Sequence, residues 1–364
     1  MNKKVLIIGS YGASNIGDEA MLESLLNNLP ESYEKWVLSG NPAETKKRHP
    51  KANRVALHFP FGLRSFLSMR WLQSIKLMKQ CDRVILGGGG LLTDGESKRA
   101  IGLWSWQLWW ANHYKKPIIM LGNSLGPFQK ESSKKRAQKA LEQMQLITVR
   151  DEVSLELAKS LAPKNSIMLG SDLAFLFNAP VNTQQKRIAL NLRPWSHAPI
   201  DIHAFVETQI KNGYSMVWIA MEASDEKLLS KEKARLIPPQ AGAFSEKINV
   251  VRPNSFTELL EILSTCEAAI GMRLHFLIAA ALANCTMAGN RLFRQSKWHV
   301  GSIKRAVPLP QSMERRRAYE RVEKGQAGGT FGGTKAKSQE HDRKNGSNRR
   351  NRFVIGRPFG KIAI

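Results

Sequence analysis

The chain has 364 residues, of which 42% are hydrophobic and 23% charged, a globular composition long enough for two domains. Its net charge of +25 is uneven, because residues 287–364 hold 19 Lys and Arg against five Asp and Glu, a net +14. Cys81, Cys266 and Cys285 form no CxxC pair and no metal-ligand spacing. This usage argues against a disulfide-stabilised secreted fold, predicts no metal site and fits the cytoplasm.

Short β-rich apolar runs alternate with helical patterns along residues 1–180 and again along 187–286. Continuous apolar strands followed by helices are typical of parallel, doubly wound sheets. The polar, proline-containing stretch 178–186 predicts a linker between the two series. The sequence therefore predicts two Rossmann-like α/β domains that face a cleft. Strands are expected at 5–9, 54–58, 83–86, 117–121, 146–149, 167–169, 187–193, 216–220, 248–252 and 268–270, with helices at 18–28, 133–144 and 274–284.

No stretch of the chain predicts a membrane span. The N-terminal run "MNKKVLIIGSYG" has only four apolar residues before a glycine, which fits a first strand better than a signal peptide. The apolar stretch 268–283 carries Arg273 and His275, which are costly inside a bilayer. The Trp-rich stretch 103–114, "LWSWQLWWANHY", could face a membrane surface or a sugar, but a packed amphipathic helix is the favoured interpretation.

The stretch "GSYGASNIGDEAML", residues 9–22, places a glycine-bearing turn between a strand and a helix that begins near Gly17. Backbone N–H groups at such a turn can approach a ligand closely, but the spacing is not the GxGxxG of dinucleotide sites. Asp18 and Glu19 in the first helical turn complement the helix dipole and would repel a phosphate. The loop therefore predicts a site for a hydroxyl-rich ligand such as a sugar. The alternative is a capped helix with Asn15 as its N-cap.

The glycine run in "LGGGGLLTDG", residues 86–95, follows another predicted strand and includes Gly88, Gly89 and Gly90, with Asp94 close behind. Glycine weakens ordered elements, so packing is a poor explanation for four glycines in a row. Close approach of the backbone to a ligand at the carboxyl end of a parallel strand is the natural reason. These residues are therefore expected to bind the same ligand as the first loop.

Two further strand ends carry charged residues. Arg150 and Asp151 lie at a strand–helix junction, where a local ion pair is the favoured interpretation. Asp172, in "GSDLAF", lies just past a strand end on the side of the predicted cleft. A structural and a functional role for Asp172 are both open at this point.

The second series of strands carries the residues that favour catalysis. Arg193 ends a predicted strand, and a guanidinium there can hold a carboxylate or phosphate in a bidentate fork; a surface arginine is the alternative. Arg273 and His275 lie where strand 268–270 meets an apolar helix. Histidine is suited to proton transfer near neutral pH, and an anionic ligand would favour its charged form at a helix N-terminus. The pair predicts a general acid beside an anion site, with a structural histidine as the alternative.

In combination, these stretches resemble the polysaccharide pyruvyl transferase family, notably the type that pyruvylates the wall polymer anchoring S-layer proteins. The resemblance covers residues 1 to about 285 and rests on "SNIGDEA", "GGGGLLTD", "LGNSLGP", "RDEVS", "SDLAF" and "MRLHFLIAAALAN", in that order. Each motif is weak alone, whereas the ordered set is specific. The resemblance implies a fold like that of GT-B glycosyltransferases, phosphoenolpyruvate as the donor, and no metal or nicotinamide cofactor.

The resemblance also implies roles for individual residues. Arg193 and Arg273 would hold the donor carboxylate and phosphate, and His275 would protonate the enol methylene. One sugar hydroxyl would attack the oxocarbenium-like carbon, and a second would displace phosphate to close a pyruvate ketal. The acceptor would bind the N-terminal domain near the 9–19 loop and residues 87–94. The sequence leaves the residue that orients the hydroxyls open among Asp18, Glu19 and Asp172.

The expected partners are phosphoenolpyruvate and a glycan or lipid-linked polysaccharide intermediate, without a specific nucleic acid. A lipid-linked acceptor extends the expected cytoplasmic location to the inner face of the membrane, where the protein would associate peripherally. The oligomeric state stays open. Two rival functions are a GT-B glycosyltransferase with a nucleotide-sugar donor and an inactive relic that binds polyanions through 287–364.

The sequence departs from the family after about residue 286. The family continues with a strand and a run like "GIAYDPKVSGF", which is absent here. One codon choice for residues 289–301, "GNRLFRQSKWHVG", reads "IAYSDKVSGML" when shifted by one base. We therefore hypothesise a frameshift near residue 286. It would leave the second domain incomplete and make 287–364 a basic, disordered, out-of-frame tail.

Overall fold

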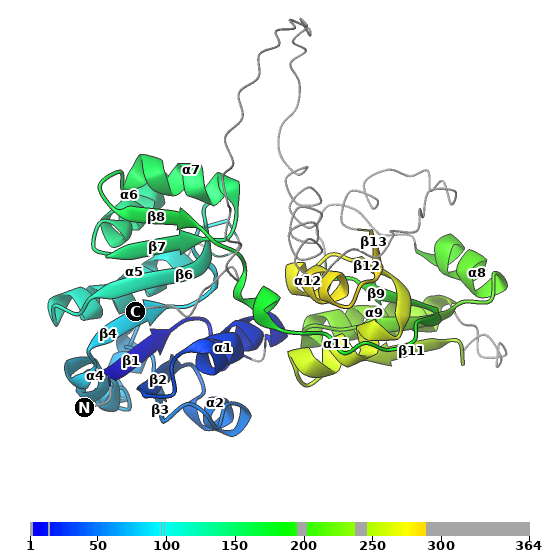
Figure 1. The fold of residues 1–364 in the computed structure, drawn as a ribbon, viewed down its shortest axis with the longest axis horizontal. Helices are drawn as coiled ribbons and strands as arrows, with labels where there is room; N and C mark the ends of the chain where they lie inside the picture. Colours follow the sequence, from blue (N-terminus) through cyan, green and yellow to red (C-terminus); the bar gives the residue numbers. More distant parts are fainter. Residues whose placement is uncertain are drawn as a thin grey trace, which may run out of the picture.

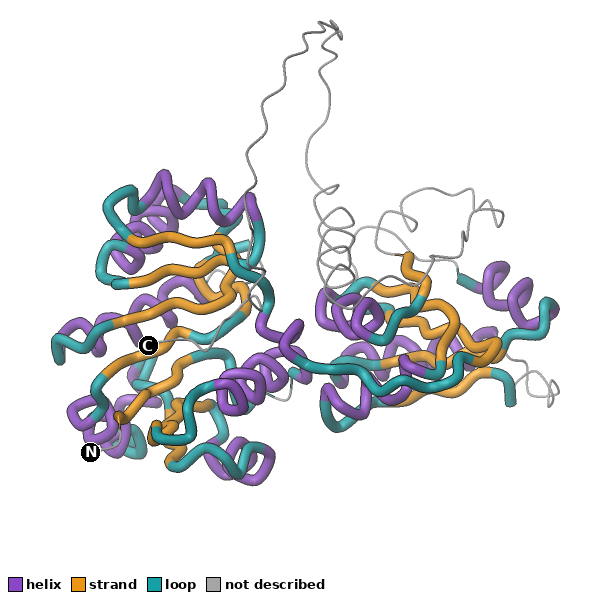
Figure 2. Tube along the Cα trace, viewed as in Figure 1, coloured by secondary structure: helices purple, strands orange, loops and turns teal. Residues whose placement is uncertain are grey.

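The computed structural model describes residues 3–13, 15–95, 97, 99–194, 202–236 and 246–288. The molecule has two halves, and each half is built around one sheet. Helices lie on both faces of each sheet (Figures 1 and 2). The first sheet contains β1 (Lys3–Ile8), β2 (Tyr33–Ser39), β3 (Arg54–Leu57), β4 (Arg83–Leu86), β5 (Gly89–Leu92), β6 (Ile118–Leu125), β7 (Leu146–Val149) and β8 (Ser166–Leu169). The second contains β9 (Gln185–Asn191), β10 (Ser215–Ile219), β11 (Ile248–Val251), β12 (Cys266–Gly271) and β13 (Thr286–Ala288).

The helices follow the strands in the alternating order that the sequence predicts. In the first half they are α1 (Ile16–Asn28), α2 (Pro42–Arg48), α3 (Leu63–Leu67), α4 (Leu72–Gln80), α5 (Ala100–His113), α6 (Glu131–Leu141), α7 (Glu152–Leu161) and the 3-10 helix η1 (Leu173–Leu176). In the second half they are α8 (His203–Lys211), α9 (Ala223–Leu236), α11 (Phe256–Ser264) and α12 (Leu274–Leu282). Among the described residues, every helix is too short or too polar to cross a bilayer.

Strand order explains where a ligand can bind. The first sheet runs β3-β2-β1-β4-β6-β7-β8, with β5 beside β6, and the second runs β11-β10-β9-β12-β13. Neighbouring strands are parallel, so their carboxyl ends share one edge of each sheet. The winding reverses between β1 and β4 and again between β9 and β12, and crevices for ligands open at such switch points. The predicted pair of Rossmann-like α/β domains is confirmed.

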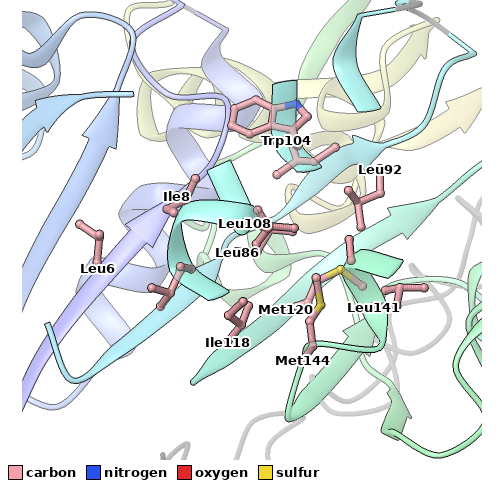
Figure 3. Packing of buried hydrophobic residues seen from close by; sticks show 14 of the residues in the cluster. Leu6, Ile8, Leu86, Leu92, Trp104, Leu108, Ile118, Met120, Leu141 and Met144 are labelled. Carbon is pink, nitrogen blue, oxygen red and sulfur yellow. The ribbon is translucent and has the colours of Figure 1, made fainter. Parts of the chain in front are cut away.

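The core of the first half follows from the alternation of side chains along each strand. Leu6 and Ile8 of β1 face a cluster completed by α4 to α7, where Trp104 and Leu108 of α5 pack over the sheet (Figure 3). Val5 and Ile7 point to the opposite face, which α1 covers. The Trp-rich stretch is therefore a packed helix, as the favoured interpretation holds, but its apolar side chains are not confined to one face, so the predicted amphipathic pattern is wrong; Trp109 is 43% exposed.

Helix α1 joins the cores of the two halves. Its residues Met21 and Leu25 pack on the first sheet, whereas Ile16 and Ala20 pack with Phe256 of α11 and the rest of the second half. A helix buried on several sides needs apolar residues around its circumference, which is why α1 lacks a clear amphipathic stripe. Figure 1 shows α1 on the side of the first half that faces α11 and α12.

Three strands are absent from the sequence prediction, namely β2, β13 and β5, which begins within the glycine run. Strand β2 was not predicted, because the charged residues Glu34 and Lys35 interrupt the apolar pattern of this stretch. The Lys35 amine is nonetheless buried and donates to the carbonyl of Leu26. Strand β13 shows that α12 does return to the sheet, pairing Thr286 to Ala288 in parallel with β12. The tail predicted to begin at residue 287 therefore begins no earlier than 289. The predictions for residues 289–364 lie outside the described residues.

Candidate functional site

The loops at the two switch points meet at the N-terminus of α1. One contact between the two halves is a hydrogen bond, in which the side chain of Asn15 donates to Glu222 Oε1 over 3.3 Å. The Asn15 side chain also accepts from the backbone N–H of Gly17 over 2.9 Å, so its predicted role as N-cap is confirmed. A second contact joins α1 to α12 through Gly17 and His275. The site therefore draws on both halves of the chain.

His275 lies in the first turn of α12, as the sequence predicts. Its imidazole ring fills the space in which a Cβ on Gly17 would stand. The Nε2 atom is buried and has no hydrogen-bond partner among the described residues; the Oδ2 atom of Asp172 is 3.7 Å away, too far for a hydrogen bond. Unpartnered buried polar atoms are rare, so this nitrogen is available to a ligand.

Asp172 connects His275 to the first half. Its carboxylate accepts from Arg150 Nη1 over 2.6 Å and from the backbone N–H of Ala174 over 2.9 Å, where it caps η1. Burial alone would raise the pKa of Asp172, but His275 and Arg150 hold it well below its ordinary value. Arg150 therefore pairs with Asp172 and not with Asp151, which caps α7 instead. The predicted local ion pair is wrong.

Asp18 is the acidic residue that faces the site. Its Oδ1 atom lies 3.6 Å from the position that a Cβ on Gly89 would take. Burial raises the pKa of Asp18 to about 6, although the nearby His275 and Arg150 and the Ser10 hydroxyl act in the opposite direction. A carboxyl that titrates near neutral pH at a switch point can accept a proton during a reaction.

Glu19 differs from its neighbour, although the sequence offered both as catalytic residues. Its Oε1 atom accepts from the backbone N–H of Gly12 over 2.8 Å, and its Oε2 atom lies 2.7 Å from Nε2 of His49. The side chain is buried, and Gly12 has a positive φ of 79°. Glu19 thus fixes the turn that precedes α1. These contacts favour a structural role, and its catalytic role stays a prediction.

Arg273 is anchored by two carboxylates. Its guanidinium donates to Asp225 over 2.8 and 2.7 Å and to Glu222 over 3.0 Å at each oxygen. Burial disfavours its charge, but the hydrogen bonds and charges of Asp225 and Glu222 outweigh burial and raise the pKa of Arg273. The predicted open anion clamp is therefore occupied by protein carboxylates in this structure.

Arg193 lies just beyond the carboxyl end of the neighbouring strand, at the position that corresponds to Arg273. Asn191 of β9 pairs with Gly271 of β12. Arg193 comes two residues after Asn191, and Arg273 comes two residues after Gly271, so the two arginines occupy corresponding positions. Arg193 is partly buried. The amide of Asn191 braces this corner, because its Oδ1 atom accepts from the backbone N–H of Arg273 over 3.1 Å.

The glycine run is explained in part by packing, which corrects the prediction. A Cβ on Gly87 would overlap the Tyr11 hydroxyl, and one on Gly88 would overlap the sulfur of Met21. Gly88 is thus needed for helix–sheet contact rather than for a ligand. Gly89 has a φ of 111°, which favours glycine. It starts β5 beside Asp18, whereas Gly90 is exposed.

Asp94 also makes contacts within the fold. Its carboxylate accepts from the backbone N–H groups of Gln129 over 2.6 Å and Lys130 over 3.2 Å. The Ser133 hydroxyl and these N–H groups hold the pKa of Asp94 below its ordinary value. The side chain is buried against the loop that leads into α6. These contacts favour a role in fixing this loop, and the role of Asp94 in binding the acceptor stays a prediction.

Sequence reasoning missed Glu222, Asp225 and His49. The first two follow the carboxyl end of β10 in "AMEASDEK", and acidic residues at a strand end were the available signal. His49 follows α2 in a polar stretch, where nothing in the sequence indicates its buried contact with Glu19. In the described residues, no group of three or more His, Cys, Asp and Glu side chains has the geometry of a metal site.

Comparison with known proteins decides the family. A sequence model of polysaccharide pyruvyl transferases matches residues 15–288, three quarters of the chain and nearly all of the described part. The chain belongs to the polysaccharide pyruvyl transferase family. Family membership makes the protein a transferase that acts on polysaccharide.

A polysaccharide pyruvyl transferase fold is also consistent with individual relatives. The amylovoran biosynthesis protein AmsJ of Erwinia amylovora is 25% identical over 339 residues, covering 75% of this chain and 79% of the relative. Two solved structures share the fold at 11% identity: a putative UDP-N-acetylglucosamine 2-epimerase from Listeria monocytogenes, with a TM-score of 0.55, and the UDP-GlcNAc 2-epimerase from Methanocaldococcus jannaschii, at 0.54. Each match covers 79% of this chain, with 79% and 83% of the respective relatives. These likenesses confirm the predicted GT-B-like architecture.

Proposed function

We propose that this polysaccharide pyruvyl transferase moves the enolpyruvyl group of phosphoenolpyruvate to a sugar of a cell-wall or surface polysaccharide and closes it into a pyruvate ketal. The observation that carries the proposal is the buried, unpartnered Nε2 of His275, which lies between the switch points of the two sheets. A proton donor at this place is what an enol donor needs. Asp18, with a pKa of about 6, supplies a matching acceptor.

The carboxylates at the site divide between two tasks. Glu19 is bound to Gly12 and His49, and Asp172 is bound to Arg150 and Ala174. Both are therefore committed to positions in the fold. Asp18 is the carboxyl left to receive the proton of a sugar hydroxyl, so we assign it as the general base. Asp172 Oδ2 lies 3.7 Å from Nε2 of His275, and we assign Asp172 as a residue that positions the imidazole.

The proposed reaction balances in two steps, an addition followed by a displacement of phosphate. His275 gives a proton to C3 of phosphoenolpyruvate, and a sugar hydroxyl bonds to C2 while Asp18 takes its proton. A second hydroxyl then bonds to C2, the bond from C2 to the phosphate oxygen breaks, and phosphate leaves. Two hydroxyl protons are released overall: one replaces the proton given to C3, and the other leaves with phosphate. No electrons are exchanged with a cofactor, and none is proposed.

Arg273 binds the donor after exchanging one of its partners. Asp225 is fully buried, whereas the side chain of Glu222 is 35% exposed and also contacts Asn15. A donor carboxylate can replace Glu222 without uncovering Asp225, because both anions offer two oxygens to the same guanidinium edge. Arg193, at the corresponding position just after β9, would hold the phosphate. The exchange would also free Asn15 for the acceptor.

The acceptor belongs to one of two polymer classes. The resemblance to enzymes that modify an S-layer-anchoring wall polymer supports a wall glycan, and a relative named for amylovoran biosynthesis supports a secreted polysaccharide. Gly89 would line its site beside Asp18, because the position of a Cβ on Gly89 lies 3.6 Å from Oδ1 of that carboxylate. The neighbouring Gly17 and Gly90 are proposed to line the same site.

The proposed function can be tested by adding phosphoenolpyruvate to the full chain with fragments of each polymer class. Phosphate release together with a carboxyethylidene group on the glycan is the expected result. His275→Gln should abolish both, while His113→Gln, an exposed histidine of α5, should leave them unchanged. Transfer from a nucleotide sugar in place of phosphoenolpyruvate would instead identify a glycosyltransferase. Absence of both activities would identify a relic.

We further propose that the reading frame shifts just after Ala288. This placement is supported by β13, whose register with β12 continues to Ala288, and by the family match, which extends to the same residue. Sequencing the gene from fresh source material across codons 280 to 364 tests the proposal. A single-base correction that restores a run like "IAYSDKVSGML" is expected. Confirmation of the present frame would refute the shift and would favour the relic.

A further inference from the structure

One surface of the first half carries more exposed apolar side chains than the rest of the described chain. Of eleven large hydrophobic residues that are substantially exposed in the described ranges, six lie within twelve consecutive positions. Monomeric proteins rarely cluster exposed apolar residues in this way unless the patch has a partner. We call this cluster the α3 patch; its members are Phe61, Leu63, Phe66, Leu67, Met69 and Leu72, with exposures of 46, 75, 49, 67, 53 and 47%.

The α3 patch rests on a rigid aromatic base. The ring of Phe66 lies 5.3 Å from that of Trp71, and the Trp71 indole donates to the Phe66 carbonyl over 2.9 Å. Trp71 in turn contacts Trp110 of α5, while Trp106 donates to the carbonyl of Pro60 over 2.7 Å. These bonds fix the backbone around α3. The apolar side chains are therefore held outward by the fold.

The sequence segment that carries the α3 patch has charges of one sign. Residues 45–81 contain nine Lys and Arg and no Asp or Glu. Arg64 and Arg70 are exposed within the patch itself, and Lys76 and Lys79 are exposed on α4 just beyond it. Apolar side chains mixed with long cationic ones, which can extend toward phosphate headgroups, are the pattern of a surface that lies on an anionic bilayer.

The position of the α3 patch connects it to the site. It follows the carboxyl end of β3, and β3, β2 and β1 are parallel, so it lies at the same sheet edge as the loop that precedes α1. Phe61 also packs against Gly102 of α5, the helix that follows β5 and its glycine run. A chain docked through this patch would turn the carboxyl edge of the first sheet toward the surface to which it is bound.

We propose that the α3 patch docks the protein on the surface of an anionic lipid bilayer. A second copy of the chain fits the patch less well, because a two-fold contact joins the patch to an identical patch, whose segment offers Arg64 and Arg70 no acidic partner. Lipid phosphates supply the opposite charge, and the acyl boundary accepts Leu63 and Leu67. The proposal concerns where the chain works, so it can fail while the proposed transfer reaction holds.

The first experiment reports insertion of the patch itself. The native Cys81, Cys266 and Cys285 are buried, so an environment-sensitive fluorophore attached to Leu67→Cys reads that position alone. Val153→Cys on α7 is the matched control, because Val153 is 72% exposed and Leu67 is 67% exposed. We expect a blue shift and a severalfold rise in emission at position 67 with phosphatidylglycerol vesicles. Phosphatidylcholine vesicles should give little change, as should position 153 with either lipid.

Three outcomes would overturn the proposal. They are no change at position 67, an equal change at position 153, and a change at position 67 that grows with protein concentration without vesicles. The last outcome would assign the patch to a second copy of the chain.

A second measurement separates the α3 patch from the basic segment 287–364. Electrostatic binding weakens at high salt, whereas apolar insertion persists, so vesicle sedimentation is carried out with the full chain at about 0.5 M salt. Leu63→Ser with Leu67→Ser should lower the remaining affinity at least about tenfold, since two exposed leucines no longer insert. Val153→Ser with Val181→Ser should not. Equal binding by both double variants would refute the patch as the docking surface.

Discussion

His275 and Gly17 lie in contact across the two halves of the chain, with the imidazole ring in the space that a Cβ on Gly17 would need. The contact fixes the ring against the first turn of α1, in the same turn as Asp18. Gly17 has ordinary helical geometry, so space and not backbone strain calls for glycine at this position. The proposed acid and base are therefore positioned by one close approach between α1 and α12.

Gly17→Ala should separate stability from catalysis. Alanine is favoured over glycine in a helix by about 1 kcal/mol, which offsets part of the cost of moving the ring. We expect the free energy of unfolding in urea to change by less than about 1 kcal/mol, while phosphate release from phosphoenolpyruvate falls about tenfold or more. Gly102→Ala, in α5 and remote from His275, is the control and should keep its activity. Full activity in Gly17→Ala would show that the ring position does not matter.

The two carboxylates on Arg273 should respond differently to removal of their charge. Asp225 is fully buried, so Asp225→Asn removes the charge that pairs with the partly buried guanidinium of Arg273. The free energy of unfolding in urea should fall by about 3 kcal/mol. Glu222 is 35% exposed, and Glu222→Gln should cost about 1 kcal/mol or less. If the donor replaces Glu222, Glu222→Gln should also lower the KM for phosphoenolpyruvate. An unchanged or higher KM would argue against the exchange.

Much of the fold follows from the sequence, because continuous apolar strands and intervening helices can be recognised without knowing their partners. The strand order could not be predicted in the same way, since it depends on which strands pair. Asn15 was recognised as a cap because its partner is two residues away. The acidic partners of Arg273 are 48 and 51 residues away in the chain, so the local sequence around Arg273 does not predict them.

Neighbours in sequence can also have opposite roles that only packing reveals. Asp18 and Glu19 looked equivalent in the first turn of α1. Helical geometry turns successive side chains by about 100°, so Asp18 faces Gly89 and Glu19 faces the turn that contains Gly12. The glycine run misled for a related reason. Glycine is required there because Tyr11 and Met21 occupy the space that a Cβ would need, and these two residues lie far from the run in the chain.

This difference predicts separable effects of Asp18→Asn and Glu19→Gln. Asp18→Asn should lower kcat about a hundredfold or more, the usual scale for loss of a general base, with little loss of stability. Glu19→Gln removes the charge that holds Gly12 and His49, so we expect a loss of about 2 kcal/mol in urea unfolding.

The Asp18 assignment also predicts the pH profile of kcat/KM, which reports the ionisable groups of the free enzyme. Because the pKa of Asp18 is raised to about 6, activity should fall as the pH decreases through that value. A profile that is flat between pH 5 and 7, where about one charge per Asp18 should change, would exclude Asp18 as the base.

His58 should make the stability of the protein pH dependent. Burial lowers the pKa of His58 from 6.5 to about 4, while its Nε2 lies 3.0 Å from the carbonyl of Gly9 and its ring meets Trp104 edge-on. The folded state therefore keeps His58 neutral where the unfolded chain binds a proton. The contribution of His58 to the free energy of unfolding is complete above pH 6.5. It is lost as the pH falls toward 4, at about 1.4 kcal/mol per pH unit.

Asp18 acts in the opposite direction over much of the same range, so the test compares two proteins rather than two pH values. The raised pKa of Asp18 favours folding when the carboxyl is protonated, and this contribution is lost as the pH rises from 3.8 to about 6. The two trends partly cancel in the wild-type curve. His58→Gln keeps a donor for the Gly9 carbonyl and removes only the histidine titration. From pH 7.5 to 4.5, urea unfolding should show the variant gaining about 2 to 3 kcal/mol relative to wild type; an equal difference at both pH values would mean that His58 titrates normally in the folded protein.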